Sequence, residues 1–173
     1  MTPLAEVGDI GTERLLLTPL RVEDADEMAI VLGDNRLHEF IGGRPSGVEE
    51  LRARYARMVA GSSDPDEEWL NWIVRRRADS CPIGTMQATL IDHGSRWIAH
   101  VAWVIGLEWQ GEGFASEAAK ALVASLRQRG ADRIVAHIHP DHKASEVVAI
   151  RAGLHPSDDI VDGERVWRTP RDA

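Results

Sequence analysis

Apolar residues along the chain follow two different periods, one typical of strands and one typical of helices. Three segments, 68–77, 82–91 and 96–106, are rich in β-branched and aromatic residues and are separated by turn-forming residues. They predict a three-stranded antiparallel meander. Ahead of it, apolar residues at helical spacing predict helices over 22–32 and 47–61, joined by a Gly- and Pro-containing loop.

The second half of the chain alternates strand and helix. An apolar stripe over 115–130 predicts a helix, which is followed by a strand over 131–140 and a helix over 143–153. An Asp-Gly pair predicts the turn of a final hairpin over 159–168. Together with a first strand over 13–20, the expected order of elements is βααβββαβαββ.

This order predicts an α+β fold, a single domain with a central mixed α/β sheet flanked by helices. A strand, helix, strand succession joins parallel strands, whereas the meander before it must be antiparallel. The domain is expected over 13–168, with an N-terminal tail over 1–12 and a C-terminal tail over 169–173. Ligands of such sheets bind where the strand direction changes, here between Val104 and Ala115.

Composition narrows the class of protein. The 173 residues, 43% of them hydrophobic, suffice for one core. Twenty Lys and Arg against 28 Asp and Glu give a net charge of -8, so no basic field favours nucleic acid. The single cysteine, Cys81, fits a reducing compartment. No signal peptide and no apolar run of the roughly 20 residues that a membrane span needs are present, so a soluble, cytoplasmic protein is expected.

The stretch "WVIGLEWQGEGFASEAAKAL" carries the clearest chemical signal. A strand ends at Gly106, a loop contains Gly111 and Gly113, and a helix follows. Backbone N–H groups would converge there on one space, and the helix dipole would favour an anion such as a phosphate. The loop lacks the Lys-Ser/Thr ending of a P-loop, which makes a nucleotide-phosphate binder the weaker interpretation.

From this loop outward, the chain resembles the GCN5-related N-acetyltransferase (GNAT) superfamily. "QGEGFA" fits the family's pyrophosphate loop, and "GFASEAAKAL" resembles the continuation in the ribosomal-protein-alanine acetyltransferase (RimJ/RimL)-like branch. "ERLLLTPLRVEDADEM", "PIGTMQATL" and "ASEVVAIRAGL" resemble the opening strand and helix, the third strand and the closing helix. The resemblance covers 13–168 and implies the GNAT fold and an N-acetyltransferase that moves an acetyl group from acetyl-CoA to a primary amine, by direct transfer in a ternary complex.

The resemblance also implies a set of cofactor contacts. The backbone of Val104 and Ile105 would pair with the pantetheine arm of acetyl-CoA. Lys143 could contact the 3′-phosphate or the adenine end, or be a solvated helix residue, and His142 stands where the family commonly has an asparagine that contacts the cofactor. The pyrophosphate would lie against the run Gln110, Gly111, Glu112, Gly113, Phe114 and Ala115.

Acetyl transfer needs a neutral amine, so a base must remove a proton, and a donor can protonate the departing thiolate. His100, on the strand that leads to the loop, is the first candidate for the base, the alternative being a packed strand histidine. His38 and Glu39 could instead face the acceptor amine. The family's tyrosine acid is absent, because Ala149 stands at its position. Ser145 matches a serine that the branch carries near the thiol, and either bonds the thiolate or caps the helix.

Several further interpretations stay open at this point. Trp72 or Trp103 could line the acceptor pocket. Histidines at 137, 139 and 142 could in principle bind a metal, but no metal is expected. The acceptor is either a protein N-terminus or a small-molecule amine. The alternative function is a non-catalytic acyl-CoA-binding sensor or regulatory domain, and strand edges around 159–168 could pair two copies in a homodimer.

Overall fold

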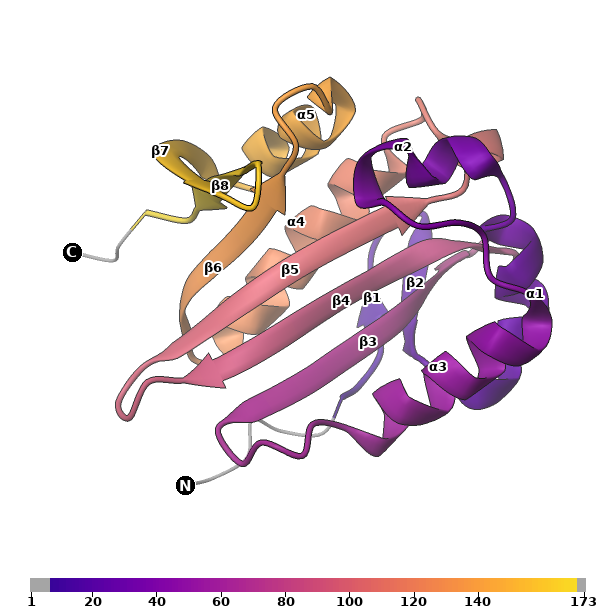
Figure 1. The fold of residues 1–173 in the computed structure, drawn as a ribbon, viewed down its shortest axis with the longest axis horizontal. Coiled ribbons are helices and arrows are strands. Elements are labelled where there is room, and N and C mark those ends of the chain that lie inside the picture. The colour runs from indigo at the N-terminus through magenta and orange to yellow at the C-terminus, as the bar shows by residue number, and fades with distance from the viewer. Residues whose placement is uncertain (1–6, 171–173) are drawn as a thin grey trace.

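The computed structural model describes residues 7–170, which form one sheet covered by helices (Figure 1). The strands are β1 (Ile10–Gly11), β2 (Leu15–Pro19), β3 (Glu67–Arg76), β4 (Pro82–Asp92), β5 (Trp97–Ile105), β6 (Ala131–Ile138), β7 (His155–Val161) and β8 (Glu164–Arg168). The helices are α1 (Ala25–Val31), α2 (His38–Ile41), α3 (Val48–Ala60), α4 (Phe114–Gln128) and α5 (Lys143–Arg151), with 3-10 turns η1 (Val22–Asp24), η2 (Asn35–Leu37) and η3 (Leu107–Trp109).

The sheet has eight strands in the order β1-β2-β3-β4-β5-β6-β8-β7. The β3-β4-β5 meander is antiparallel, and β5 and β6 are parallel. Both arrangements confirm the mixed sheet that the sequence predicts. No helix in the described range 7–170 combines the length and the apolar character that a membrane crossing requires.

Two neighbouring residues of β3 show the two layers of the core. Trp72 is fully buried in the larger apolar cluster, which contains residues of α4 and α5. Ile73 is fully buried in a second cluster on the opposite face, with residues of α1 and α3. Because successive side chains of a strand point to opposite faces, α4 and α5 cover one face and α1 and α3 the other.

Strands β5 and β6 separate towards their carboxyl ends (Figure 1). Their pairing runs from Trp97 opposite Ala131 to His100 opposite Val135 and goes no further. Beyond this point β6 continues beside β8 as far as Ile138. The last residues of β5 therefore have β4 on one side and an open edge on the other, at the place where the sequence predicts a ligand.

The structure adds elements that have no periodic signal. Ile10–Gly11 pairs with β2 inside the segment expected as an N-terminal tail, and Ile10 is buried. Thr169, in the expected C-terminal tail, is buried and donates its amide to the Ile134 carbonyl. Helix α2 lies in the segment expected as a loop. The predicted Asp162-Gly163 turn is confirmed, with both residues at positive φ.

Candidate functional site

The larger of two adjoining cavities lies at the open end of β5 and has a volume of about 640 Å³. It is bordered by the end of β5, the glycine loop, the first turn of α4, helix α5 and helix α2. We call it the loop cavity; its lining includes Glu39, Phe40, Trp103, Val104, Ile105, Gln110, Gly111, Gly113, Phe114, Ala115, His142, Lys143 and Ser145.

The glycine loop aims backbone donors at this cavity. Gly111 and Gly113 both have φ of 82°, a conformation that side-chain-bearing residues rarely adopt. Gly113 is the N-cap of α4, whose first-turn amides have no acceptor within the helix. The Gln110 side chain donates from Nε2 to the Ile105 carbonyl over 2.8 Å, which ties the loop to the end of β5. This arrangement suits a phosphate group.

Arg14, on the segment before β2, holds the loop from outside the cavity. It donates from Nη1 to the Glu112 carbonyl over 3.0 Å and from Nε to Glu117 over 2.7 Å, and its guanidinium lies 4.4 Å from the Phe114 ring centre. Burial raises the pKa of the Glu117 carboxyl, but hydrogen bonds from Thr12 and Arg14 bring it below its ordinary value. No local motif connects Arg14 with the loop, so sequence reasoning missed it.

Basic side chains lie around the loop cavity although the chain is acidic. Arg36, Lys143 and Arg151 line it, against the carboxylates of Glu39 and Asp141. Lys143 and Arg151 are eight residues apart and therefore share one side of α5. Sequence reasoning missed Arg151 and Arg36, but that helical spacing could have revealed Arg151. The lining supplies cations for a polyanionic ligand, and Lys143 also pairs with Glu146 over 3.1 Å.

Helices α2 and α5 meet over the cavity. The Phe40 and His142 rings are stacked, and His142 Nε2 lies 3.4 Å from the Ser145 hydroxyl. Ser145 is buried. Burial lowers the pKa of His142, and the neighbouring His139 lowers it further, whereas the Glu39 carboxylate acts against this shift. His142 and Ser145 thus form a polar pair at the cavity wall.

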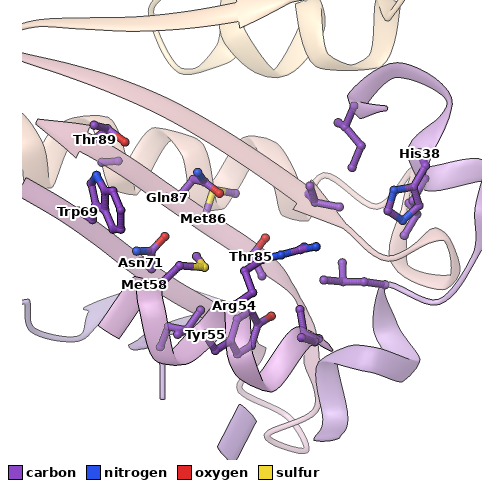
Figure 2. Close-up of a pocket in the computed structure, with 17 residues that line it drawn as sticks. His38, Arg54, Tyr55, Met58, Trp69, Asn71, Thr85, Met86, Gln87 and Thr89 are labelled. Atoms are coloured by element: carbon purple, nitrogen blue, oxygen red, sulfur yellow. The ribbon is translucent and has the colours of Figure 1, made fainter. Parts of the chain in front are cut away.

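The second cavity lies on the α3 side of the sheet and has a volume of about 410 Å³ (Figure 2). We call it the sheet pocket. Asn71 and Gln87, which are partners on β3 and β4, lie on its floor with Thr85 and Thr89. Its walls are mostly apolar, and its lining comprises Leu20, Leu32, Leu37, His38, Ile41, Leu51, Arg54, Tyr55, Met58, Trp69, Asn71, Thr85, Met86, Gln87, Ala88, Thr89 and Val104.

Two polar atoms of the sheet pocket are buried without a partner in the described part of the chain, the Tyr55 hydroxyl and His38 Nε2. Burial raises the pKa of Tyr55 to about 12, with a further contribution from Asp24. His38 Nδ1 lies 3.2 Å from the Gly42 carbonyl. Because a carbonyl oxygen only accepts, this contact assigns the proton to Nδ1 and leaves a lone pair on Nε2. Nε2 is therefore the ring nitrogen of His38 that can accept a proton.

The two cavities meet at the end of β5. Leu37, Ile41 and Val104 line both of them. A group bound along the open edge of β5 would thus lie next to a molecule in the sheet pocket, which is the arrangement that a direct transfer between two bound molecules requires.

Most of the predicted cofactor residues lie together in the loop cavity, with Glu39, which was predicted to face the acceptor. Glu112 is an exception, since it does not line the cavity and its carbonyl accepts from Arg14. His38, also predicted to face the acceptor, lies in the sheet pocket. Trp103 lines the loop cavity and is absent from the sheet pocket.

His100, the first candidate for the base, lines neither cavity and precedes Val104 by four residues on an extended strand, a separation of about 13 Å. Its ring lies 5.7 Å from that of His137. Burial lowers the pKa of His100, with His137 and His93 contributing. Its role as the base therefore stays a prediction, beside the alternative of a packed strand histidine.

Trp72, predicted as a possible lining residue of an acceptor pocket, lines neither cavity. It is fully buried on the α4 side of the sheet, and its Nε1 donates to the Gly8 carbonyl over 3.0 Å. Trp69 lies in the sheet pocket instead, because it is three positions away and faces the other side of β3. Among residues 7–170, no three His, Cys, Asp or Glu side chains gather closely enough to hold a metal ion.

Comparison with known families gives one match over most of the chain. Residues 14–155 match the family described as "Acetyltransferase (GNAT) domain". No curated protein is similar enough to count as a relative.

Solved structures of this class share the fold at low sequence identity. A GNAT-family acetyltransferase from Bordetella pertussis has a TM-score of 0.72 at 21% identity, covering 94% of this chain and 99% of that one. The microcin C7 self-immunity acetyltransferase MccE, in complex with acetyl-CoA and AMP, has a TM-score of 0.76 at 16% identity, covering 96% and 97%. RimL, the ribosomal L7/L12 α-N-protein acetyltransferase in complex with coenzyme A, has a TM-score of 0.76 at 16% identity, covering 92% and 96%.

Proposed function

The chain belongs to the family of acetyltransferase (GNAT) domains, and from this premise we propose that it transfers the acetyl group of acetyl-CoA directly to a primary amine held in the sheet pocket. One observation carries this proposal. Leu37, Ile41 and Val104 line both cavities, so a thioester at the end of β5 and an amine in the sheet pocket would be neighbours. A direct transfer within a ternary complex then needs no covalent enzyme intermediate.

Acetyl-CoA fits the loop cavity by its chemistry. The amides of the glycine loop and of the first turn of α4 would hold the pyrophosphate, and the free edge of β5 at Val104 and Ile105 would pair with the pantetheine arm. Lys143 and Arg151 supply positive charge for the remaining phosphate. MccE and RimL, which share the fold, were solved with acetyl-CoA and coenzyme A respectively.

Two residues on opposite sides of the place where the two cavities meet would assist the proton transfers. His38 Nε2 would take a proton from the ammonium form of the acceptor, after which the amine nitrogen attacks the thioester carbon. The C–N bond forms, the C–S bond breaks, and the second proton of the amine passes to the departing thiolate, which leaves as the free thiol of coenzyme A. Ser145, beside His142, would donate a hydrogen bond to the departing thiolate. Ala149, buried at the family's tyrosine position, cannot do so.

The test is calorimetric titration with acetyl-CoA, followed by thiol release in the presence of a panel of amines. Saturable acetyl-CoA binding with amine-dependent thiol release supports the transferase. Binding of acetyl-CoA without thiol release for any amine would identify the protein as an acyl-CoA sensor. Absence of acetyl-CoA binding would overturn the assignment of the loop cavity.

Two further features of the enzyme stay predictions. The cytoplasm is the expected location, since a single cysteine fits a reducing compartment. A homodimer through the β7 edge of the sheet is the expected assembly. In β7, Ile160 and Val161 are 52% and 43% exposed, so an apolar strand edge is open to a second copy. Light scattering would measure the mass in solution.

A further inference from the structure

The sheet pocket differs in charge from the protein as a whole. The chain carries a net charge of -8, yet no Asp or Glu lines this pocket in the described structure. Its one permanently charged side chain is Arg54. A pocket that selects a polycationic amine needs carboxylates to pair with the additional ammonium groups. The lining therefore points away from polyamines and towards an acceptor with few positive charges.

The guanidinium of Arg54 has N–H donors that an anionic ligand could bind. It extends from α3 across the strands, on the side of the pocket where His38 lies (Figure 2). Its Nη2 donates to the Ser46 hydroxyl over 2.8 Å, and it forms no ion pair with another described residue. Arg52, two residues earlier on the same helix, pairs with both Asp26 and Glu49. Arg54 is thus a guanidinium at an apolar pocket, with donors left for a carboxylate.

The pocket interior offers both apolar contact and unpartnered polar groups. Tyr55 is 3% exposed, and its hydroxyl has no partner in residues 7–170. An unsatisfied buried hydroxyl is costly, so a bound ligand that supplies an acceptor or donor would be favoured. Asn71 and Gln87 present amides from the floor, and Trp69 and Met58 present apolar surface. A volume of about 410 Å³ is suited to a small molecule.

We propose, building on the function proposed above, that the acceptor is an amino-acid-like small molecule with one anionic group, one amine and an apolar body. Its carboxylate would pair with Arg54, its amine would lie near His38 Nε2, and its side chain would fill the apolar part of the sheet pocket. The Tyr55 hydroxyl and the floor amides would select polar atoms on the ligand. Polyamines and other polycations are excluded by the absence of carboxylates.

The experiment compares three amines as acceptors: phenylalanine, phenylalaninamide, which has the same side chain without the carboxylate, and spermidine. We expect kcat/KM for phenylalanine to exceed that for phenylalaninamide by about tenfold or more, because a charge-assisted hydrogen bond contributes that much. Arg54→Gln should abolish this preference by lowering kcat/KM for phenylalanine to the level found for phenylalaninamide. Arg57→Gln, an exposed arginine of α3 outside the pocket lining, is the matched control and should behave as the wild type.

The outcomes separate this inference from the proposed function. Thiol release with spermidine or phenylalaninamide at rates equal to or above that with phenylalanine would overturn the acceptor class and leave the transferase intact. Failure to bind acetyl-CoA would overturn the transferase itself. Phenylalanine binding to the coenzyme A complex, measured by calorimetry, gives a readout without turnover: binding that Arg54→Gln weakens supports the inference, and no binding by the wild type contradicts it.

Discussion

The rings of Phe40 and His142 are stacked, with centroids 4.4 Å apart and planes 8° from parallel. This contact joins α2, which carries His38, to the N-terminus of α5, which carries Ser145. The proposed base and the proposed thiolate donor therefore stand on two helices that meet through one aromatic pair. The stack thus brings two walls of the loop cavity into contact.

Replacing Phe40 with alanine should widen the cavity and expose His142. Aromatic pairs contribute about 0.5–1.5 kcal/mol beyond their buried area, so we expect acetyl-CoA affinity to fall by up to roughly tenfold. Since burial is the main cause of the lowered pKa of His142, that pKa should rise towards 6.5. Calorimetry and an NMR titration of the His142 ring measure the two effects. Phe40→Leu removes the ring but keeps an apolar side chain over His142, so it should change the pKa of His142 less. An unchanged pKa of His142 in Phe40→Ala would contradict the role of the stack.

The role of the glycine loop in ligand binding can be tested by comparing two glycines that both have a positive φ. Gly113 has φ of 82° and Gly130, at the far end of α4, has φ of 98°. An alanine in this conformation costs roughly 1–2 kcal/mol at either position. Both variants should lose similar stability in urea, but only Gly113→Ala should weaken acetyl-CoA binding, by at least about tenfold, as the loop relaxes and its amides turn away. Equal affinities for the two variants would mean that the loop does not hold the ligand.

The assignment of the base rests on the contrast between two histidines. His38→Gln should lower kcat by a factor of about 10² to 10⁴, with acetyl-CoA binding unchanged. His100→Gln should leave kcat as it is, because His100 lines neither cavity. The reverse result, a loss in His100→Gln and none in His38→Gln, would return the role to the strand histidine.

Arg14 provides a test of action from outside the cavity. Arg14→Met removes the bond to the Glu112 carbonyl and the cation over Phe114, so the loop should become less ordered and KM for acetyl-CoA should rise by about five- to tenfold. Arg77→Met is the control, because Arg77 bonds the carbonyls of Thr12 and Leu15 without touching the loop. If the two variants differ only in stability and share one KM, Arg14 is merely structural.

The strands that bear the site could be predicted from sequence, but the facing of individual side chains could not. The meander, the parallel pair and the glycine loop follow from local patterns over ten or more residues. Trp72 and Trp69 both stand on β3, yet the register that sends Trp72 to the α4 side depends on pairing with β4, opposite Met86. An error of one residue in the assumed register assigns a side chain of the core to the pocket, or the reverse.

Residues that act through contacts between distant parts of the chain also could not be predicted from sequence. Arg14 touches Glu112 and Glu117 across about a hundred positions of sequence, and no spacing rule predicts such a contact. The sequence offers His38 as a candidate to face the acceptor, but its proposal as the base depends on the Gly42 carbonyl, which sets its tautomer. His100 has a suitable residue type on the strand that leads to the loop, but its absence from the lining of both cavities became visible only in the structure.

The depressed pKa values of His100 and His142 predict how stability depends on pH. Burial is the first cause at both sites, so the folded protein disfavours their charged forms, and both values lie below the ordinary 6.5. Between the folded and the unfolded pKa, the unfolded chain binds more protons, so the free energy of unfolding rises with pH there. Stability from these two sites is thus fully present above about pH 6.5 and is lost as the pH falls through and below that value. Urea unfolding from about pH 8 to about pH 5 should show this decrease in the free energy of unfolding. The variant His100→Gln should reduce the slope of that free energy against pH. An unchanged slope in His100→Gln would assign the effect to other groups.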